Sequence, residues 1–293
     1  MTRSQSTTIG FSAILLWALL ALFTVGTLPV PPLQLNAICF AIGGTIGLIW
    51  TGATGQFSAL RGLPPAAWLL GVVGLCGYHA LYFAALRRAP AAEAGLIAYL
   101  WPLLIVLFSG LLPGERLRAG HLLGAFMGFA GAALIILGGR GGYDPAYLDG
   151  YLLALACALA WSGYSVLSRR FSEVPTAAVT VFCLATSVIS ALLHLAFEAT
   201  AWPAQTSGWL SILALGLGPV GLAFYTWDIG VKRGDIQLLG VASYAAPLLS
   251  TLALVLAGIT DPSWKIALAA ALVTGGAAIA ARASFRKSDR PNS

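Results

Sequence analysis

The sequence has very little charge. Only 9% of its 293 residues are Asp, Glu, Lys or Arg, whereas 59% are hydrophobic. Soluble domains carry about 25% charged residues, and a single core of ordinary composition could not bury this much apolar surface. The shortage of charge therefore excludes a soluble protein and predicts an integral membrane protein.

Cysteine and catalytic motifs are also scarce. The four cysteines lie inside apolar runs and show no CxxC spacing, so neither a disulfide framework nor a metal site is expected. The sequence also lacks a GxxxxGK[ST] loop, an HExxH motif and paired carboxylates within the apolar runs. We therefore expect no cofactor, no ATP-driven transport by this chain alone, and no enzyme activity.

Ten long apolar runs make up most of the chain. Each is about long enough to cross a bilayer as a helix, which takes roughly 20 residues. They are about twice as long as barrel strands, and backbone groups that face lipid must be satisfied within their own segment, so an all-α polytopic fold is predicted. Pro- and Gly-rich breaks place the predicted spans at 9–28, 33–51, 66–86, 92–112, 119–138, 149–170, 176–198, 208–231, 236–258 and 263–284.

The basic residues give the expected orientation. The net charge of +6 comes from residues scattered through short loops and the tail, which indicates topology rather than a nucleic-acid site. If the N-terminus is cytoplasmic, only Arg87, Arg88, Arg140 and Lys265 fall on the opposite side. The other twelve of the 16 basic residues are then cytoplasmic, and this bias predicts that both termini are cytoplasmic.

The second half of the chain repeats the first at a fixed offset. Five residues, Arg87, Arg88, Gly95, Tyr99 and Pro102, recur 145 residues later as Lys232, Arg233, Gly240, Tyr244 and Pro247. Trp17 recurs as Trp161 at an offset of 144. The two halves, 1–145 and 146–293, hold five predicted spans each, and an odd number forces the second half to enter the membrane upside down. Inverted repeats of this kind are a recurrent plan for secondary transporters. Chance similarity between apolar segments is the alternative.

Polar and aromatic side chains interrupt the third and fourth spans at similar depth. Counting outward from a turn centred near Ala89 and Pro90, His79 falls level with Leu100 and Tyr78 with Trp101, so these side chains are expected to face one another. Ionisable groups inside a membrane are costly and usually face a cavity or a partner. We expect His79 either to hydrogen-bond a substrate or change charge during transport, or to remain neutral against a neighbouring helix.

Aromatic residues deep in the spans also suggest a cavity, because Trp and Tyr normally collect at the bilayer interfaces. Their rings can stack on an aromatic substrate and hold its ammonium group by cation–π attraction, although ordinary packing is the alternative for each. The predicted substrate-binding residues are Trp17, Tyr78, His79, Tyr82, Tyr99, Trp101, Trp161, Tyr164, Tyr225, Ser243 and Tyr244.

Three further residues are candidates for gating or coupling. Pro102 and Pro247 lie within spans, where a proline removes a backbone donor and allows a bend. Asp228 is the only carboxylate clearly inside a span. It lies four residues before Lys232, which predicts an ion pair with an outward-reaching lysine, the alternative being a gate or ion-coupling group.

These features together resemble a known family. Two five-span halves, an early Trp in each, a basic pair before a Gly…Tyr-x-x-Pro pattern, and a Gly-rich last span are similar to the drug/metabolite transporter superfamily, EamA type. The resemblance covers nearly the whole chain, and it implies a central cavity inside helices 1–4 and 6–9, with helices 5 and 10 at the periphery.

Within that superfamily the chain most resembles exporters of aromatic and other neutral amino acids. This resemblance implies alternating access that moves amino acids from cytoplasm to periplasm across a bacterial inner membrane. We expect a monomer with small-molecule substrates. The alternatives are multidrug or other small-metabolite efflux, for which only Asp228 could bind a cation, and, in a different class, an intramembrane enzyme or a non-transporting scaffold. Phosphorylated substrates are disfavoured because the deep spans lack Lys and Arg.

Overall fold

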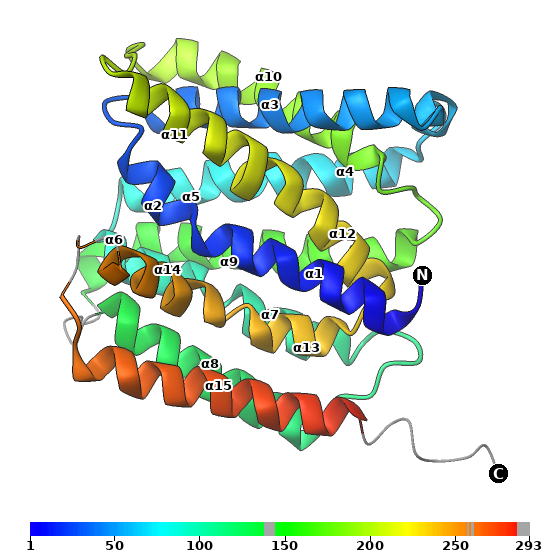
Figure 1. Ribbon diagram of the computed structural model, residues 1–293, viewed down its shortest axis with the longest axis vertical. Helices are drawn as coiled ribbons and strands as arrows, with labels where there is room; N and C mark the ends of the chain where they lie inside the picture. Colours follow the sequence, from blue (N-terminus) through cyan, green and yellow to red (C-terminus); the bar gives the residue numbers. More distant parts are fainter. Residues whose placement is uncertain (138–143, 257, 259–260, 286–293) are drawn as a thin grey trace.

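The computed structural model describes residues 1–137, 144–256, 258 and 261–285. Ten helical stretches in these ranges are long and apolar enough to cross a membrane, which confirms the predicted number and class. They are Arg3–Val25, Pro32–Ala53, Pro65–Leu86, Ala91–Ser109, Ala119–Leu137, Pro145–Phe171, Ala178–Phe197, Thr206–Arg233, Ile236–Leu256 and Trp264–Ser284 (Figure 1). The first begins six residues before the predicted start, because a capping box at Thr2 and Gln5 starts the helix at Arg3.

Several spans consist of more than one helical element. The helical elements of the first half are α1 (Arg3–Ala18), α2 (Leu20–Val25), α3 (Pro32–Ala53), η1 (Gln56–Leu60), α4 (Pro65–Val72), η2 (Val73–Gly77), α5 (Tyr78–Leu86), α6 (Ala91–Ala98), α7 (Trp101–Ser109) and α8 (Ala119–Leu137). In the second half they are η3 (Pro145–Tyr147), α9 (Leu148–Leu167), η4 (Ser168–Phe171), α10 (Ala178–Phe197), α11 (Thr206–Leu217), η5 (Gly218–Leu222), α12 (Ala223–Arg233), α13 (Ile236–Ala242), α14 (Ala245–Leu256) and α15 (Trp264–Phe285). The predicted division after residue 145 falls where η3 begins and stays an expectation.

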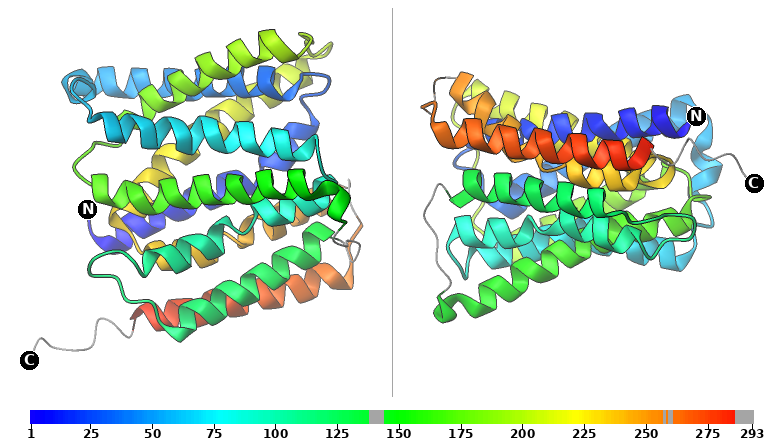
Figure 2. Two further views of the ribbon diagram at one scale, coloured as in Figure 1. Left: turned by 180° about the vertical axis from the view of Figure 1, so that it is seen from behind. Right: turned by 90° about the horizontal axis from the view of Figure 1, so that it is seen from below.

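The two halves interleave instead of lying side by side. Figures 1 and 2 show α3 with α10 along one edge of the bundle and α8 with α15 along the opposite edge. Between these edges α1 packs on α12 and α5 packs on α9, so that each contact joins the two halves. In the repeat α1 is equivalent to α9 and α12 is equivalent to α5. The two inner contacts are therefore equivalent to each other, as the inverted repeat requires.

Small residues bring α8 and α15 into close contact at their edge. A Cβ atom placed on Gly124 would lie 2.5 Å from the carbonyl oxygen of Gly276, and one on Gly276 would lie 2.6 Å from the oxygen of Gly124. Membrane helices approach closely where such residues face each other. The Gly-rich fifth and tenth spans are therefore a peripheral pair, as the resemblance implied.

Two π-helical turns interrupt equivalent spans. They lie at η2 and η5, and adding 145 to the bounds of η2, 73 and 77, gives the bounds of η5, 218 and 222. A π turn widens the helix and leaves backbone carbonyls without their usual partners. No sequence pattern predicted these π turns, which are a finding of the structure.

The helices also break just before the two mid-span prolines. The first break separates α6 from α7 at Tyr99 and Leu100, and the second separates α13 from α14 at Ser243 and Tyr244. The hydroxyl of Tyr99 donates to the carbonyl of Ser243 at 3.1 Å, while the hydroxyl of Tyr244 accepts from the backbone N–H of Leu103 at 3.0 Å. Each half thus satisfies a backbone group that the break in the other half leaves open. We call these two contacts the tyrosine brace.

The bundle has two distinguishable ends. The first residue of α1 and the last turn of α15 lie at one end, called here the Arg3 end. The turn between α5 and α6 lies at the other, called the Arg87 end. There the side chain of Arg87 pairs with Glu198 at 3.0 Å, and Glu198 also accepts from the backbone N–H groups of Leu33 and Gln34 at the start of α3.

Candidate functional site

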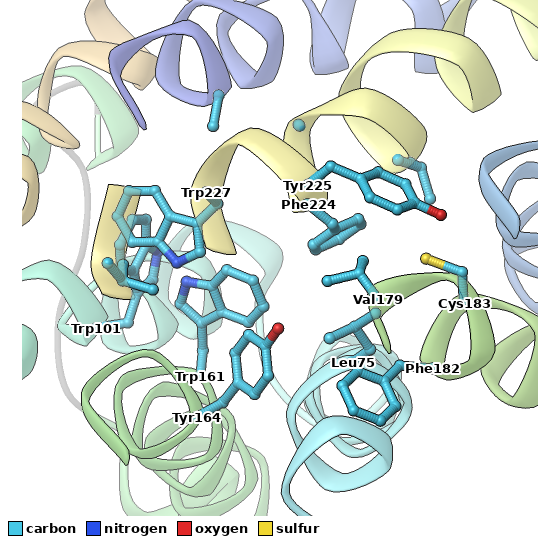
Figure 3. Close-up of a cluster of buried hydrophobic side chains, with 14 of the residues drawn as sticks. Leu75, Trp101, Trp161, Tyr164, Val179, Phe182, Cys183, Phe224, Tyr225 and Trp227 are labelled. Carbon is cyan, nitrogen blue, oxygen red and sulfur yellow. The ribbon is translucent and has the colours of Figure 1, made fainter. Parts of the chain in front are cut away.

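Five large rings from both halves meet in the middle of the bundle. The ring of Trp17 on α1 has its centroid 6.0 Å from Trp101, 5.8 Å from Trp161, 6.3 Å from Phe224 and 5.1 Å from Trp227. Figure 3 shows the last four of these rings, which come from α7, α9 and α12 and are at most 5% exposed. These five residues are called the tryptophan cluster. Sequence reasoning predicted three of them, Trp17, Trp101 and Trp161.

A second set of side chains, all half-buried, lies against this cluster. It consists of Tyr78, His79 and Tyr82 on α5 and Tyr99 at the end of α6, and it is called the polar wall. The Tyr78 ring lies 5.5 Å from Trp161 and the Tyr99 ring 5.9 Å from Trp101. All four residues are among the predicted substrate-binding residues, and the structure brings them together.

The polar wall presents unused hydrogen-bonding atoms. Within the described residues, the hydroxyls of Tyr78 and Tyr82 and the Nε2 atom of His79 make no hydrogen bond to protein, although His79 Nδ1 lies 2.7 Å from the carbonyl oxygen of Leu75. Since a carbonyl can only accept, Nδ1 donates, and Nε2 of the neutral ring is an acceptor. Half-buried polar atoms without protein partners can bind the polar groups of a small molecule.

The π turns position residues of both sets. Leu75, whose carbonyl binds His79, lies in η2, and Pro219, whose carbonyl accepts from Trp17 Nε1 at 3.1 Å, lies in η5. Each π turn therefore orients one of these side chains, His79 or Trp17, through a carbonyl that a regular helix would have used internally. Since the two turns are equivalent in the repeat, the two halves hold these side chains in the same way.

The repeat also relates residues of the tryptophan cluster and the polar wall to one another. His79 corresponds to Phe224 and Tyr82 to Trp227, both at 145 residues, and Trp17 corresponds to Trp161 at 144. Sequence reasoning missed Phe224 and Trp227, which the same offset could have identified. It also missed Phe40 on α3, whose ring lies 5.1 Å from His79 and 5.3 Å from Phe224. At these equivalent positions the first half of the chain therefore carries polar side chains, His79 and Tyr82, and the second half carries apolar rings, Phe224 and Trp227.

Other predicted residues contact protein groups. Tyr225 points away from Trp161 in Figure 3, and its hydroxyl donates to the carbonyl of Gly43 at 3.0 Å. Tyr164 lies beside Trp161 and packs on Gly74, where a Cβ would come within 2.4 Å of its ring. Ser243 and Tyr244 are fully buried, and both take part in the tyrosine brace. For these residues, as for the polar wall, substrate contact stays a prediction.

Asp228 forms the expected ion pair with Lys232, with a separation of 2.9 Å. Lys232 does not reach outward, however: it is 9% exposed and donates to the carbonyl of Val174 at 2.9 Å. The second carboxylate oxygen of Asp228 accepts from Thr176 at 2.8 Å. This satisfied pair is held at the Arg3 end, and a role in gating or coupling, like that of Pro102 and Pro247, stays a prediction.

Two hollows lie near the site, one toward each end of the bundle. A groove of about 440 Å³ lies at the Arg87 end, between α3, α5 and α10, and it is lined by Leu33, Ala80, Phe83, Ala84, Arg87, Arg88, Leu193 and Phe197. Phe83 contacts His79 of the polar wall with ring centroids 6.3 Å apart. At the Arg3 end, the cavity between Tyr164, Ser168, Asp228 and Lys232 measures about 10 Å³, which is at the lower limit for one water molecule.

Known proteins share both the sequence and this architecture. An aromatic amino acid exporter YddG of Ancylobacter novellus is 58% identical over 283 residues, which cover 96% of this chain and 98% of that protein. The aromatic amino acid exporter YddG of Escherichia coli strain K12 is 26% identical, with 94% and 96% covered. A crystal structure with 58% sequence identity superposes with a TM-score of 0.93, covering 97% of this chain and 99% of that one.

The model of the EamA-like transporter family matches residues 7–137 and 148–282, one match in each half. Together these matches span most of the chain and include every residue of the tryptophan cluster and the polar wall. The chain therefore belongs to the EamA-like transporter family, as its resemblance in sequence implied.

Proposed function

We propose that this transporter exports aromatic and other neutral amino acids, binding them between the tryptophan cluster and the polar wall. Family membership makes the chain a membrane transporter rather than an enzyme. The observation that carries the choice of substrate is the meeting of these two sets of side chains, with apolar rings on one side and unpaired hydroxyl and imidazole groups on the other. The 58% identity to an aromatic amino acid exporter supports the same substrate class.

The chemistry of the cavity fits a neutral zwitterion. An aromatic side chain can stack edge-on or offset among Trp17, Trp101 and Trp161, as these rings already do with one another. The ammonium group can bind over an indole face, and the carboxylate can accept hydrogen bonds from Tyr78 or Tyr82. Among the described residues, neither set contains a side chain of permanent charge, so a substrate with net charge would lack a counter-charge.

Alternating access would move the substrate past these residues. In the mechanism we propose, the two interleaved halves rock around the tryptophan cluster, and the broken helices before Pro102 and Pro247 accommodate the change. We further propose that the carrier is a monomer in a bacterial inner membrane, with the Arg3 end cytoplasmic. Twelve of the 16 basic residues then lie on the cytoplasmic side, in agreement with the positive-inside rule.

Flux into liposomes tests the proposal. Purified protein in liposomes should take up labelled phenylalanine, and Trp101→Ala and Tyr82→Ala should each lower the initial rate by about tenfold through lost stacking and hydrogen bonding. Trp264→Ala is the matched control, because Trp264 is 69% exposed at the start of α15, remote from the cavity.

Three outcomes would contradict parts of the proposal. Normal uptake by both cavity variants would refute the site. Flux of cationic drugs or other metabolites, with none of any amino acid in a panel, would favour the small-metabolite alternative. A parent protein that moves nothing in liposomes would favour a non-transporting scaffold.

A further inference from the structure

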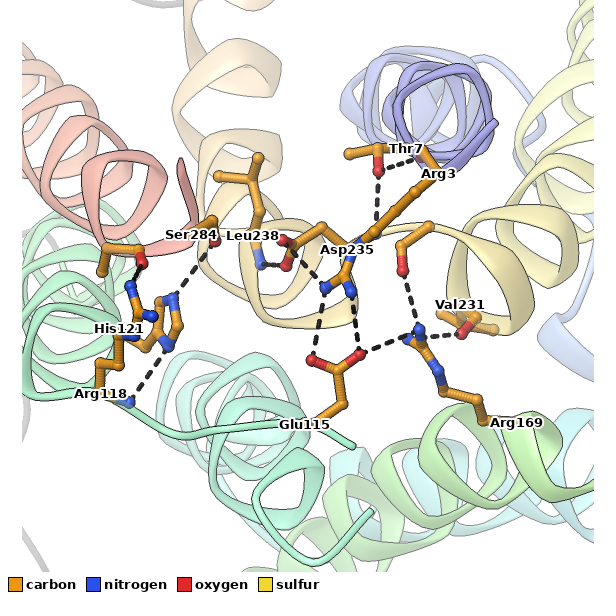
Figure 4. Close-up of polar contacts among 12 residues, drawn as sticks. Arg3, Thr7, Glu115, Arg118, His121, Arg169, Val231, Asp235, Leu238 and Ser284 are labelled. Carbon is orange, nitrogen blue, oxygen red and sulfur yellow. Dashed lines mark hydrogen bonds and ion pairs between the residues drawn. The ribbon is translucent and has the colours of Figure 1, made fainter. Parts of the chain in front are cut away.

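Four charged side chains form one network at the Arg3 end (Figure 4). Glu115 lies at its centre: one carboxylate oxygen is 3.3 Å from Arg3 Nη1 and 3.1 Å from Arg169 Nη2, and the other accepts from Arg3 Nη2 at 3.3 Å. Arg3 also pairs with Asp235 at 3.2 Å. The network holds two positive and two negative charges and is therefore balanced. It is called the Glu115 network.

The network joins both halves of the repeat. Arg3 begins α1, and Glu115 lies in the loop between α7 and α8, both in the first half. Arg169 lies in η4, and Asp235 caps α13 by accepting from the backbone N–H of Leu238 at 2.9 Å, both in the second half. Arg169 also donates to the carbonyls of Val231 and Gly234, at 3.3 and 3.1 Å. Parting the halves at this end therefore requires breaking the Glu115–Arg169 and Arg3–Asp235 ion pairs.

Burial makes these contacts costly to break. The Glu115 side chain is 5% exposed and that of Arg169 is 18% exposed, in contrast to ordinary surface pairs, which contribute little. Parting the halves would separate the mostly buried Glu115 carboxylate from Arg169, and removing one partner of a buried pair is strongly unfavourable. The network thus favours the closed arrangement of this end.

The repeat shows that this network has no equivalent at the opposite end. Equivalent positions, 145 residues away, are Leu148 for Arg3, Thr260 for Glu115, Thr24 for Arg169 and Pro90 for Asp235, and none of them carries charge. At the Arg87 end the pair between Arg87 and Glu198 joins the halves instead, and the Arg87 side chain there is 54% exposed. The groove of about 440 Å³ also lies at that end.

We propose that Glu115 is a positioning residue for transport: by binding Arg3 and Arg169 it holds the Arg3 end closed, so that the empty carrier rests open toward the Arg87 end. This inference rests on the proposed function in that it assumes alternating access. Opening the Arg3 end requires energy to break the network, and substrate can supply it only by binding the rearranged state more tightly. Neutralising Glu115 should therefore shift the resting population toward opening at the Arg3 end.

Two cysteine reporters measure that population from both ends. Ser168→Cys places a thiol in the small cavity at the Arg3 end, and Ala84→Cys places one in the groove at the Arg87 end. The native cysteines are at most 8% exposed, so background labelling by a water-soluble maleimide should be low and is measured on the parent. Each reporter is combined with Glu115→Gln, with Arg169→Gln as a second variant, and with the control Glu173→Gln. Glu173 is exposed in the loop between η4 and α10 at the same end.

The expected result is reciprocal. Glu115→Gln and Arg169→Gln should label the Ser168→Cys reporter about tenfold faster and the Ala84→Cys reporter more slowly, in the range usual for a conformational coupling. Glu173→Gln should change neither rate. Faster labelling at both ends would indicate loosened structure and overturn the proposal, as would unchanged rates or an equal effect of Glu173→Gln. Labelling needs no transport, so failure of the parent to move phenylalanine would refute the proposed function independently.

Discussion

At the scale of single residues, the polarity of the cavity depends on one half of the repeat. His79 and Tyr82 have Phe224 and Trp227 as their equivalents, so a substrate placed between them meets hydrogen-bonding groups on one side and only rings on the other. The polar residues of α5 would give the proposed site a direction, because under the proposed function the zwitterionic group of the substrate would be satisfied on that side alone.

Replacing His79 by the residue at its equivalent position tests this difference. His79→Phe should keep the ring contacts with Phe40 but remove the acceptor at Nε2, so the KM for phenylalanine should rise by about tenfold, the loss of one hydrogen bond to a charged group. Liposome flux measures KM, and thermal unfolding should show little change. His121→Gln is the control, since His121 lies beside Ser284 near the Arg3 end, remote from the cavity. An unchanged KM would contradict a substrate contact by His79.

Residue chemistry alone singled out many of the side chains that meet in the bundle, and their role as a substrate site stays a prediction. Deep Trp and Tyr residues are unusual in membrane helices, which drew attention to Trp17, Trp101, Trp161 and the tyrosines of the polar wall, and His79 stood out as an ionisable group. Residue chemistry could not separate them from Tyr225, whose position is just as deep but whose hydroxyl bonds to Gly43 on a neighbouring helix. Which face a tyrosine takes depends on the rotation of its helix, and the π turns set that rotation without a clear sequence signal.

At the scale of helices, the breaks and π turns are stabilised by contacts between the halves. The predicted bends near Pro102 and Pro247 agree with the helix breaks, because a proline cannot donate to the preceding turn. How the freed backbone groups are satisfied could not be predicted from the sequence. The tyrosine brace supplies the answer, and it joins equivalent breaks from opposite halves.

Removing one hydroxyl of the brace should destabilise the protein. Tyr244→Phe leaves the Leu103 N–H without its acceptor in a fully buried place, which should lower the free energy of unfolding by about 1 kcal/mol, a typical value for a hydrogen bond between membrane helices. Thermal unfolding in detergent measures the change. Tyr147→Phe, at a tyrosine that is 39% exposed, is the control. Equal melting temperatures for the two variants would show that the brace contributes no stability.

The contact between α8 and α15 makes a second prediction about elements. Gly124→Ala would place a methyl group 2.5 Å from the oxygen of Gly276, so the two helices must separate and the melting temperature should fall. Gly163→Ala is a matched control in α9, because a Cβ there meets no atom within 4 Å and alanine favours the helix. A melting temperature lowered equally by both substitutions would contradict close packing as the reason for glycine at position 124.

At the scale of the whole molecule, the fold could be predicted almost completely. Ten apolar runs and one fixed offset were enough to predict ten spans in two inverted halves, since bilayer thickness and the odd number of spans leave few alternatives. The interleaving of the halves was beyond reach, because it depends on which faces of the helices pack together. The Glu115 network was missed for the same reason: its members lie in four separate loops or helix ends, and sequence reasoning read Arg3 and Arg169 only as topology signals.

The inverted arrangement predicts which face of the membrane each loop occupies. Ser58 lies between the second and third spans, and Ala204 between the seventh and eighth, which are equivalent connections in the two halves. Five spans per half place them on opposite faces, and the distribution of Lys and Arg places Ser58 in the cytoplasm. A membrane-impermeant maleimide applied to intact spheroplasts should therefore label Ala204→Cys at once and Ser58→Cys only after lysis. Labelling of both from outside would contradict the inverted halves, whereas the reverse order would turn the carrier over and place the Glu115 network on the outer face.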